Sequence, residues 1–217
     1  MGSPKVLIVF SLIISLMTTV AAQSLSEKAA EEESGLSRIL RTSGLLAVRE
    51  SHTLKDVPTV KSKITCELMV VRNLLSEELA GKEESLTIGL ILKSKEEYST
   101  RTANIDPEEI DGLIASIELI QSKGMEFLSA SSVPQEYELA GTIINSSSEI
   151  HYRTKEGLIL AAFENRGSLT FGIKVSSTAD WELLKSTGSN PGIEILLSNL
   201  KSAKTIAGEV LMMINEG

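Results

Sequence analysis

The amino-acid sequence predicts an α+β protein with two pseudo-repeated units of antiparallel β-meander, each followed by a C-terminal α-helix packed on the sheet. Three observations lead to this fold class. Apolar and polar residues alternate in several stretches between residues 63 and 176, an amphipathic helix pattern lies at residues 106–124, and a related helix pattern closes the chain. Helices that pack on an antiparallel sheet define the α+β class.

The first 22 residues have the pattern of a secretory signal peptide. Lys5 provides the positive charge, Val6 to Met17 form an uncharged apolar run, and small residues precede a cleavage site between Ala22 and Gln23. The alternative is a membrane anchor, but the run is shorter than the roughly 20 apolar residues that a spanning helix needs. We therefore expect a secreted or periplasmic protein that contacts a membrane only through an uncleaved signal segment.

Removal of residues 1–22 leaves 195 residues with 20 Lys and Arg against 29 Asp and Glu, a net charge of −9. A chain of this length can bury a core as one domain or as two small ones. The acidic balance disfavours nucleic-acid binding unless the cations are clustered. Cys66 is the single cysteine and cannot form an internal disulfide. A buried thiol is the simplest interpretation, and an intermolecular disulfide is the alternative.

Residues 23–60 form a leader that is rich in Glu and Ser at its start, and we expect it to be flexible or helical and to end near Pro58. The pattern changes after this residue. Alternating apolar side chains then predict three antiparallel strands, at residues 63–73, 85–94 and 97–105.

Residues 106–124 carry the strongest helix pattern. Asp106 fits the N-cap, Pro107 fits the first turn, and Glu109 completes an Asp-x-x-Glu capping box. The apolar residues that follow have the spacing of one helical stripe: Ile110, Leu113, Ile114, Ile117 and Ile120. Gly124 is expected to end the helix as a C′ glycine. The first sheet-plus-helix unit is therefore predicted to span residues 61–124.

The second sheet-plus-helix unit is predicted to span residues 125–217. It begins with a weakly structured bridge at residues 125–135 and ends its strand region with a loop at residues 178–191. Alternation and turn residues between these segments predict strands at residues 136–144, 149–156, 158–165 and 168–176. Alternation in residues 192–198 predicts one more strand.

The last helix is expected to begin at Asn199. Asn190-Pro191 resembles Asp106-Pro107, but the alternation in residues 192–198 argues against a helix start there. Counted from Asn199, the stripe offsets of the first helix fall on five apolar residues: Ala203, Ile206, Ala207, Val210 and Met213. We interpret residues 61–217 as two copies of one unit in a single compact domain. A chance resemblance between two short β-β-α segments is the alternative.

Two tyrosine-bearing strand segments, EYST at 97–100 and HYRT at 151–154, occur with a glycine-bearing meander and a capped helix. This arrangement resembles uncharacterised exported bacterial proteins over about residues 63–214. It is also similar to the sheet-plus-helix module of Whirly-type and transcriptional-coactivator-type single-strand binders. That likeness implies a fold but not nucleic-acid binding, because this acidic chain lacks the stacking aromatics and Lys or Arg tracks that single-strand binding requires.

We predict no catalytic residue, no cofactor and no metal site. His52 and His151 lie outside any ligand-type spacing, and nucleophile-elbow, phosphate-loop, dinucleotide-binding and EF-hand patterns are missing from the sequence. The leading hypothesis is therefore a non-enzymatic binding or assembly module. Its partner is an unknown protein or small ligand, and homo-oligomerisation is compatible with it. The alternatives are an extracellular or periplasmic enzyme with an unrecognised site and, from the fold likeness alone, single-stranded nucleic-acid binding.

Two Tyr and Arg pairs are the candidate ligand or partner contacts. Tyr98 with Arg101 and Tyr152 with Arg153 recur near comparable strands, where they could contact an anion or a partner on one sheet face. The alternative is that all four are ordinary residues of half-exposed strands, for which Tyr and Arg are common.

Overall fold

The structure is a computed structural model that describes residues 33–75, 85–130, 136–139, 142–145, 149–165, 167–176, 179, 181–186 and 191–215. The predicted signal peptide at 1–22, its cleavage site between Ala22 and Gln23, and the first part of the leader lie outside these residues. Residues 33–217 belong to one compact unit. No helix in the described part of the chain has both the length and the apolar character needed to cross a membrane.

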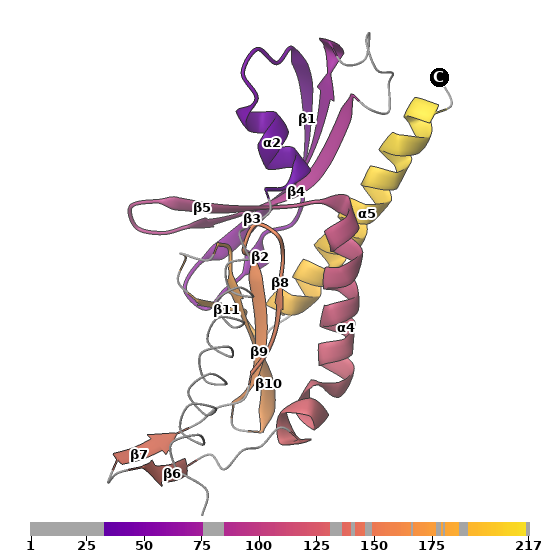
Figure 1. Cartoon of the computed structure of the whole chain (residues 1–217). Coiled ribbons are helices and arrows are strands. Elements are labelled where there is room, and N and C mark those ends of the chain that lie inside the picture. The colour runs from indigo at the N-terminus through magenta and orange to yellow at the C-terminus, as the bar shows by residue number, and fades with distance from the viewer. Residues whose placement is uncertain are drawn as a thin grey trace, which may run out of the picture. The chain divides into compact units, whose positions relative to one another are not determined.

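The described residues form antiparallel sheets and three helices, so the predicted α+β class is confirmed (Figure 1). The helices are α2 (Gly35–Arg41), α4 (Pro107–Ala130) and α5 (Gly192–Asn215). The strands are β1 (Ala47–Thr53), β2 (Val57–Pro58), β3 (Lys63–Asn73), β4 (Leu86–Lys95), β5 (Thr100–Ile105), β6 (Glu136–Leu139), β7 (Thr142–Asn145), β8 (Glu149–Arg153), β9 (Ile159–Asn165), β10 (Ser168–Lys174) and β11 (Glu182–Leu183).

The strands form two larger sheets and one hairpin. The first sheet has the order β1-β3-β4-β5, with β2 also paired to β3, and the second has the order β11-β10-β9-β8. The separate hairpin is β6–β7. The two larger sheets meet where Thr59 forms an antiparallel bridge with Leu184 and the Val60 N–H donates to the Leu183 carbonyl at 2.8 Å. Residues that precede β3 therefore pair with residues that follow β10.

Both larger sheets contribute to one hydrophobic core. Alternate residues of β3 are buried, as the sequence predicts, and they pack with side chains from the second sheet and from both long helices. Members of this core include Leu68, Leu90, Leu113, Ile117, Leu160, Ile173, Leu196 and Leu200. Burial of one such side chain stabilises a fold by about 1.5–3 kcal/mol. Because the core is shared, the apolar face of each larger sheet is buried partly by side chains of the other sheet.

Helix α2 covers the opposite face of the first sheet. Leu36 is fully buried there against Val71 and Ile91. Gly89 of β4 permits this contact, because a Cβ at that position would lie 2.8 Å from a Leu36 methyl carbon. The first sheet is thus covered on both faces, by α2 on one side and by the shared core on the other.

The prediction of a flexible or helical leader is wrong for residues 47–53 and 57–58, which form β1 and β2. Strand β1 pairs with β3 along its full length, from Ala47 opposite Asn73 to Thr53 opposite Glu67. Most of its side chains are exposed at the sheet edge. Backbone pairing therefore stabilises β1, and the alternating apolar pattern that identifies a half-buried strand does not occur.

The prediction that the first helix ends at Gly124 is also wrong. Helix α4 continues to Ala130, so residues 125–130 of the predicted bridge are helical. Gly124 is buried, and a Cβ there would lie 3.2 Å from a Leu169 methyl carbon of β10. The glycine therefore permits a close helix–strand contact within the helix, and the boundary placed between residues 124 and 125 falls inside one element.

The strand predicted at residues 192–198 and the N-cap predicted at Asn199 are both wrong. Helix α5 begins at Gly192, and its buried residues have helical spacing: Ile193, Leu196, Leu197, Leu200 and Ala203. A helical stripe repeats with every turn, so counting from Asn199 identified the apolar face but not the first residue. Asn199 instead donates from Nδ2 to the Lys55 carbonyl at 2.6 Å.

The remaining predicted strands of the second unit differ from the structure in two places. Residues 136–144 contain the hairpin β6–β7 instead of one strand, and the predicted loop at 178–191 contains β11. Strands β8, β9 and β10 lie within the predicted ranges. The duplication of the two units stays a prediction.

The two long helices lie side by side, and α4 also contacts β8, β9, β10 and β4 (Figure 1). Exposed polar side chains connect them in three pairs: Gln121 with Glu194 at 2.6 Å, Glu118 with Lys201 at 2.7 Å, and Asp111 with Lys204 at 2.7 Å. Residue numbers rise along α5 as they fall along α4, so the helices are antiparallel. Exposed ion pairs contribute about 0–1 kcal/mol each, so apolar contacts provide most of the stability of this interface.

Cys66 is buried in β3, as expected, and burial raises the pKa of its thiol to about 11. Because only the thiolate reacts readily, we expect slow reaction of the folded protein with an aromatic disulfide reagent at pH 8 and fast reaction after unfolding in urea. A Ser99→Cys variant, with its new thiol in the exposed β4–β5 turn, should show one additional fast equivalent. Equal rates for Cys66 in folded and unfolded protein would contradict this.

Candidate functional site

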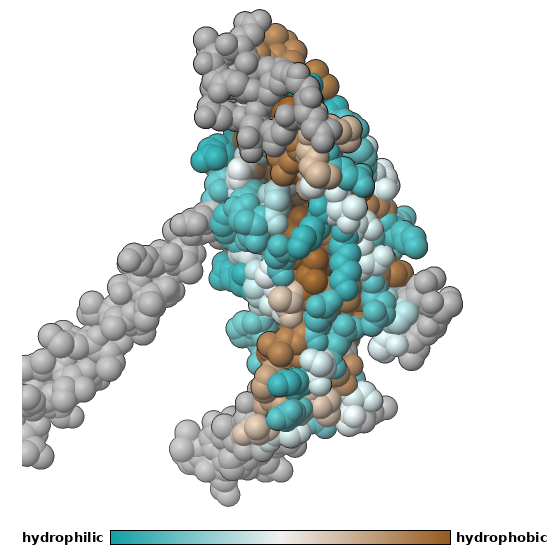
Figure 2. All heavy atoms as spheres, turned by 90° about the vertical axis from the view of Figure 1, so that its right-hand side faces the viewer, coloured by the Kyte–Doolittle hydropathy of each residue, from teal (hydrophilic) through white to brown (hydrophobic). Residues whose placement is uncertain are grey.

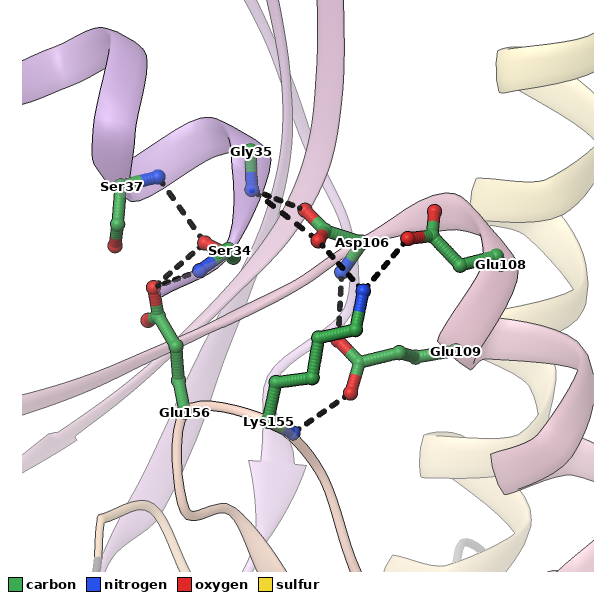
Figure 3. Close-up of polar contacts among 8 residues, drawn as sticks. All are labelled: Ser34, Gly35, Ser37, Asp106, Glu108, Glu109, Lys155 and Glu156. Carbon is green, nitrogen blue, oxygen red and sulfur yellow. Dashed lines mark hydrogen bonds and ion pairs between the residues drawn. The ribbon is translucent and has the colours of Figure 1, made fainter. Parts of the chain in front are cut away.

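Polar groups from three distant segments meet where α2 and α4 begin (Figure 3). The segments are the start of α2, the start of α4, and the turn between β8 and β9. We call this set the polar junction; it consists of Ser34, Gly35, Ser37, Asp106, Glu108, Glu109, Lys155 and Glu156.

Glu156 contacts the start of α2. Its Oε1 accepts hydrogen bonds from the Ser34 backbone N–H at 3.1 Å and from the Ser34 hydroxyl at 2.6 Å, and its Oε2 accepts from the Asn104 N–H at 3.0 Å. Burial opposes ionisation of this carboxyl, but the hydrogen bonds from Ser34, Ser37 and Asn104 outweigh it and lower the pKa. The folded protein therefore favours the charged form of Glu156.

Asp106 and Glu109 connect the start of α4 to the other two segments. The predicted capping box forms in part, because Glu109 Oε2 accepts from the Asp106 backbone N–H at 3.2 Å. The Asp106 carboxylate instead accepts the N–H of Gly35, at 3.0 and 3.2 Å. The other Glu109 oxygen accepts from the Lys155 backbone N–H at 2.7 Å. The acids that the sequence assigns to one helix therefore connect three segments.

Lys155 provides the cation of the junction. Its Nζ lies 2.8 Å from Glu108 Oε1 and 3.5 Å from Asp106 Oδ2. The hydrogen bond to Glu108 raises the pKa of Lys155, and the same bond lowers the pKa of Glu108. Both groups are therefore held in their charged forms.

A pocket of about 400 Å³ opens beside the polar junction. Its lining includes four junction residues together with residues of α2, β4, α4 and α5, among them Arg38, Leu86, Thr87, Ile88, Pro107 and Leu211. The pocket thus brings together apolar side chains of β4 and α5 and charged side chains from several elements.

The pocket lies along an open edge of β4. Strand β3 pairs with β4 from Leu86 onward, but β5 pairs only with Leu90 to Lys95. Residues 86–89 therefore have no strand partner on the β5 side among the described residues. Successive side chains of a strand point to opposite faces. A pocket lined by Leu86, Thr87 and Ile88 in succession must therefore follow the strand edge.

A second, more open pocket of about 600 Å³ follows the surface of α5. Every described residue that lines it comes from this one helix, including Ser198, Lys201 and Thr205. Groups from other elements do not converge there within the described part of the chain, so the pocket at β4 is the better candidate.

The predicted contact residues lie in different environments. Tyr98 is 93% exposed in the β4–β5 turn, and Arg101 of β5 has its Nε 3.1 Å from Glu96 Oε2. Tyr152 packs against α4, because a Cβ on Gly112 would lie 2.7 Å from its hydroxyl oxygen, and Arg153 is exposed on β8. None of the four predicted residues is among the described residues that line the pocket.

Sequence reasoning gave no role to Lys155 or Glu156. Glu156 contacts Ser34, which lies 122 positions away, and Lys155 contacts Glu109, which lies 46 positions away. Capping signals extend over only three or four residues. The acids that precede α4 were visible in the sequence, but the partners of those acids were not.

Within the described residues, no group of three or more His, Cys, Asp or Glu side chains is arranged to bind a metal ion. His52 Nε2 lies 3.1 Å from Glu50 Oε1 on β1, and His151 Nδ1 lies 3.5 Å from Glu149 Oε1 on β8. The two histidines therefore belong to different sheets, each beside a carboxylate of its own strand.

Comparison with known proteins does not indicate a function. The sequence matches no protein-family model, and neither the curated proteins nor the solved structures contain a significant match. The resemblance to exported bacterial proteins and to Whirly-type modules stays a prediction.

Proposed function

We propose that the protein is an exported binding or assembly module that acts by contact with a partner. The observation that supports this proposal is the pocket beside residues 86–89 of β4. An open strand edge presents backbone N–H and C=O groups with which another chain can pair. Natural sheets usually cover or interrupt such edges, so an edge with a pocket beside it is typical of a contact surface.

The charged groups around the pocket favour contact over catalysis. General acid–base catalysis is most efficient when the pKa of the catalytic group lies near the working pH. The pKa of Lys155 is raised and that of Glu108 is lowered, so both shifts move these groups further from neutrality. Lys155 and Glu108 are therefore better suited to holding a partner in place by charge complementarity than to proton transfer.

Exposed apolar side chains offer further contact area. At the end of α5, Leu211, Met212 and Met213 are 36, 61 and 67% exposed. Figure 2 shows apolar side chains that reach the surface in a band between polar ones, on the side that faces right in Figure 1. Methionine adapts readily to different partners, and grouped apolar side chains often mark interaction sites.

Photo-crosslinking in the exporting cells tests the binding proposal. A photoreactive benzoylphenylalanine at position 211, which lines the pocket at the end of α5, is expected to give a discrete adduct after illumination. The same residue at position 98, in the exposed β4–β5 turn, is the control and should give little adduct. An adduct of twice the chain mass identifies a second copy, and any other mass identifies a different partner. No adduct at position 211, or equal adducts at both positions, would contradict the proposal.

Export is tested by processing of the amino terminus. We expect the mature protein to begin at Gln23, with intact-mass spectrometry showing the loss of 22 residues. Signal peptidases require a small residue before the cut, so Ala22→Leu should abolish processing, whereas the matched change Ala30→Leu should not. Recovery of the unprocessed wild-type chain from the exported fraction would count against a signal peptide.

A further inference from the structure

We propose that the pocket binds an extended, carboxylate-bearing peptide segment, which adds as a strand to residues 86–89 of β4 in line with β5. This inference rests on the proposed binding function and names the class of ligand. Two features of the ligand would be recognised. Its extended backbone would pair with the edge of β4, and one acidic side chain would bind a cation of the pocket.

The geometry around β4 favours an extended chain over a compact ligand. On one face of the sheet, α2 forms a wall, with Leu36 against Gly89 and Gly35 close to Thr87. On the other face, Leu211 lines the pocket together with Leu86 and Ile88. Four strand residues extend over about 13 Å at roughly 3.3 Å per residue. A peptide strand of about four residues fits this pocket and can pair with residues 86–89 of β4.

The polar junction lies at one end of the pocket. Strand β5 stops at Ile105, opposite Leu90, and the chain turns at Asp106 into α4. The carboxylate of Asp106 accepts the N–H of Gly35, which fixes the start of α2 beside this turn. An added strand would therefore occupy the positions that β5 leaves open, between α2 and the start of α4.

Among the described charged groups that line the pocket, Arg38 is the one suited to bind a carboxylate. Glu33 is paired with Arg41 at 3.0 Å, and Glu108 and Asp106 are paired with Lys155. Arg38 also lines the pocket, and no described residue forms an ion pair or hydrogen bond with its guanidinium. A guanidinium binds a carboxylate through two parallel hydrogen bonds. An acidic side chain on the peptide would supply a partner that Arg38 does not have among the described residues.

The test uses the protein purified after export and labelled hexapeptides of alternating Val and Thr with one central residue varied. By fluorescence anisotropy, the Glu peptide is expected to bind about threefold to fivefold more tightly than the Lys peptide, as for an exposed ion pair. N-methylation of the amides that face β4 should weaken binding by about threefold to tenfold, because it removes backbone hydrogen bonds. N-methylation of the amides that face solvent is the control.

Charge reversal at Arg38 separates a specific contact from a general charge effect. Arg38→Glu should reverse the preference for the Glu peptide, so that the Lys peptide binds more tightly. Arg38→Gln should remove the difference between the two peptides. Lys95→Glu, at the other end of β4, changes the net charge equally and should leave the preference unchanged. Circular dichroism should show that all three variants are folded.

Three results would overturn the inference: equal binding of Glu and Lys peptides to the wild type, no effect of N-methylation, or no binding of any peptide at millimolar concentration. If a discrete adduct still forms at position 211, the protein is a binding module whose partner is recognised in another way. If neither peptide nor adduct is seen, the proposed function fails as well.

Discussion

Replacement of Gly192 by alanine is expected to destabilise the protein by about 1–3 kcal/mol or more, the range for an overpacked site. A Cβ at this position would lie 2.6 Å from the Pro58 carbonyl oxygen and 3.3 Å from the Lys185 backbone nitrogen. Both atoms belong to the backbone and cannot rotate away. The clash would therefore push the start of α5 away from the place where the two sheets meet, next to the bridge between Thr59 and Leu184.

Gly208 of the same helix is the matched control. A Cβ there meets no atom within 4 Å, so Gly208→Ala adds a better helix former without a clash. This change should stabilise the protein by about 0.5–1 kcal/mol. Urea unfolding of both variants, followed by circular dichroism, should give shifts of opposite sign. Stabilisation at both positions would show that helix propensity, and not the contact with Pro58, determines the effect at Gly192.

Glu156→Gln is expected to destabilise the protein by about 1–3 kcal/mol at pH 7. The amide has one oxygen, whereas the carboxylate accepts hydrogen bonds at both of its oxygens, from Ser34 and from Asn104. The amide nitrogen must therefore face one of these donors, which leaves a partly buried donor unsatisfied.

The same variant should change the dependence of stability on pH. The pKa of Glu156 is lowered by folding from an ordinary value of 4.5. Its contribution to stability is therefore complete above about pH 4.5 and is lost as the pH falls through the lower pKa of the folded state. The wild type should lose more stability than Glu156→Gln in this acidic window.

Thermal unfolding between pH 3 and pH 7 measures this difference. Glu164→Gln, which alters an exposed carboxylate on β9, is the control and should leave the wild-type pH dependence intact. If Glu156→Gln has the same pH dependence as the wild type, the hydrogen bonds from Ser34 and Asn104 do not stabilise the charged carboxylate.

The elements that could be predicted from the sequence are those with one regularly buried side. Ile64, Cys66 and Leu68 alternate because β3 has one face in the core, and Ile110, Leu113 and Ile117 recur at helical spacing because α4 does. Such patterns depend only on the geometry of the element itself and on burial of apolar area.

The elements that were missed or misplaced depend on contacts between distant residues. Strand β1 has no apolar alternation, because it is an edge strand stabilised by pairing with β3. The start of α5 carries apolar residues at positions that satisfy both a strand and a helix pattern. It becomes a helix because Gly192 and the buried side of its first two turns pack where the two sheets meet.

The sequence by itself determined the α+β class, the strands with one buried face, and the apolar faces of both long helices, because periodic burial leaves a local pattern. The tertiary structure alone decided the candidate site. Glu156 and Lys155 reach the starts of α2 and α4 only after both strand sets share one core. Among the described residues, positions 86–89 of β4 have no strand partner on the β5 side, because β5 ends at Ile105, where the chain turns into α4. Pairing across such distances depends on the folded backbone, and no local pattern of residues encodes it.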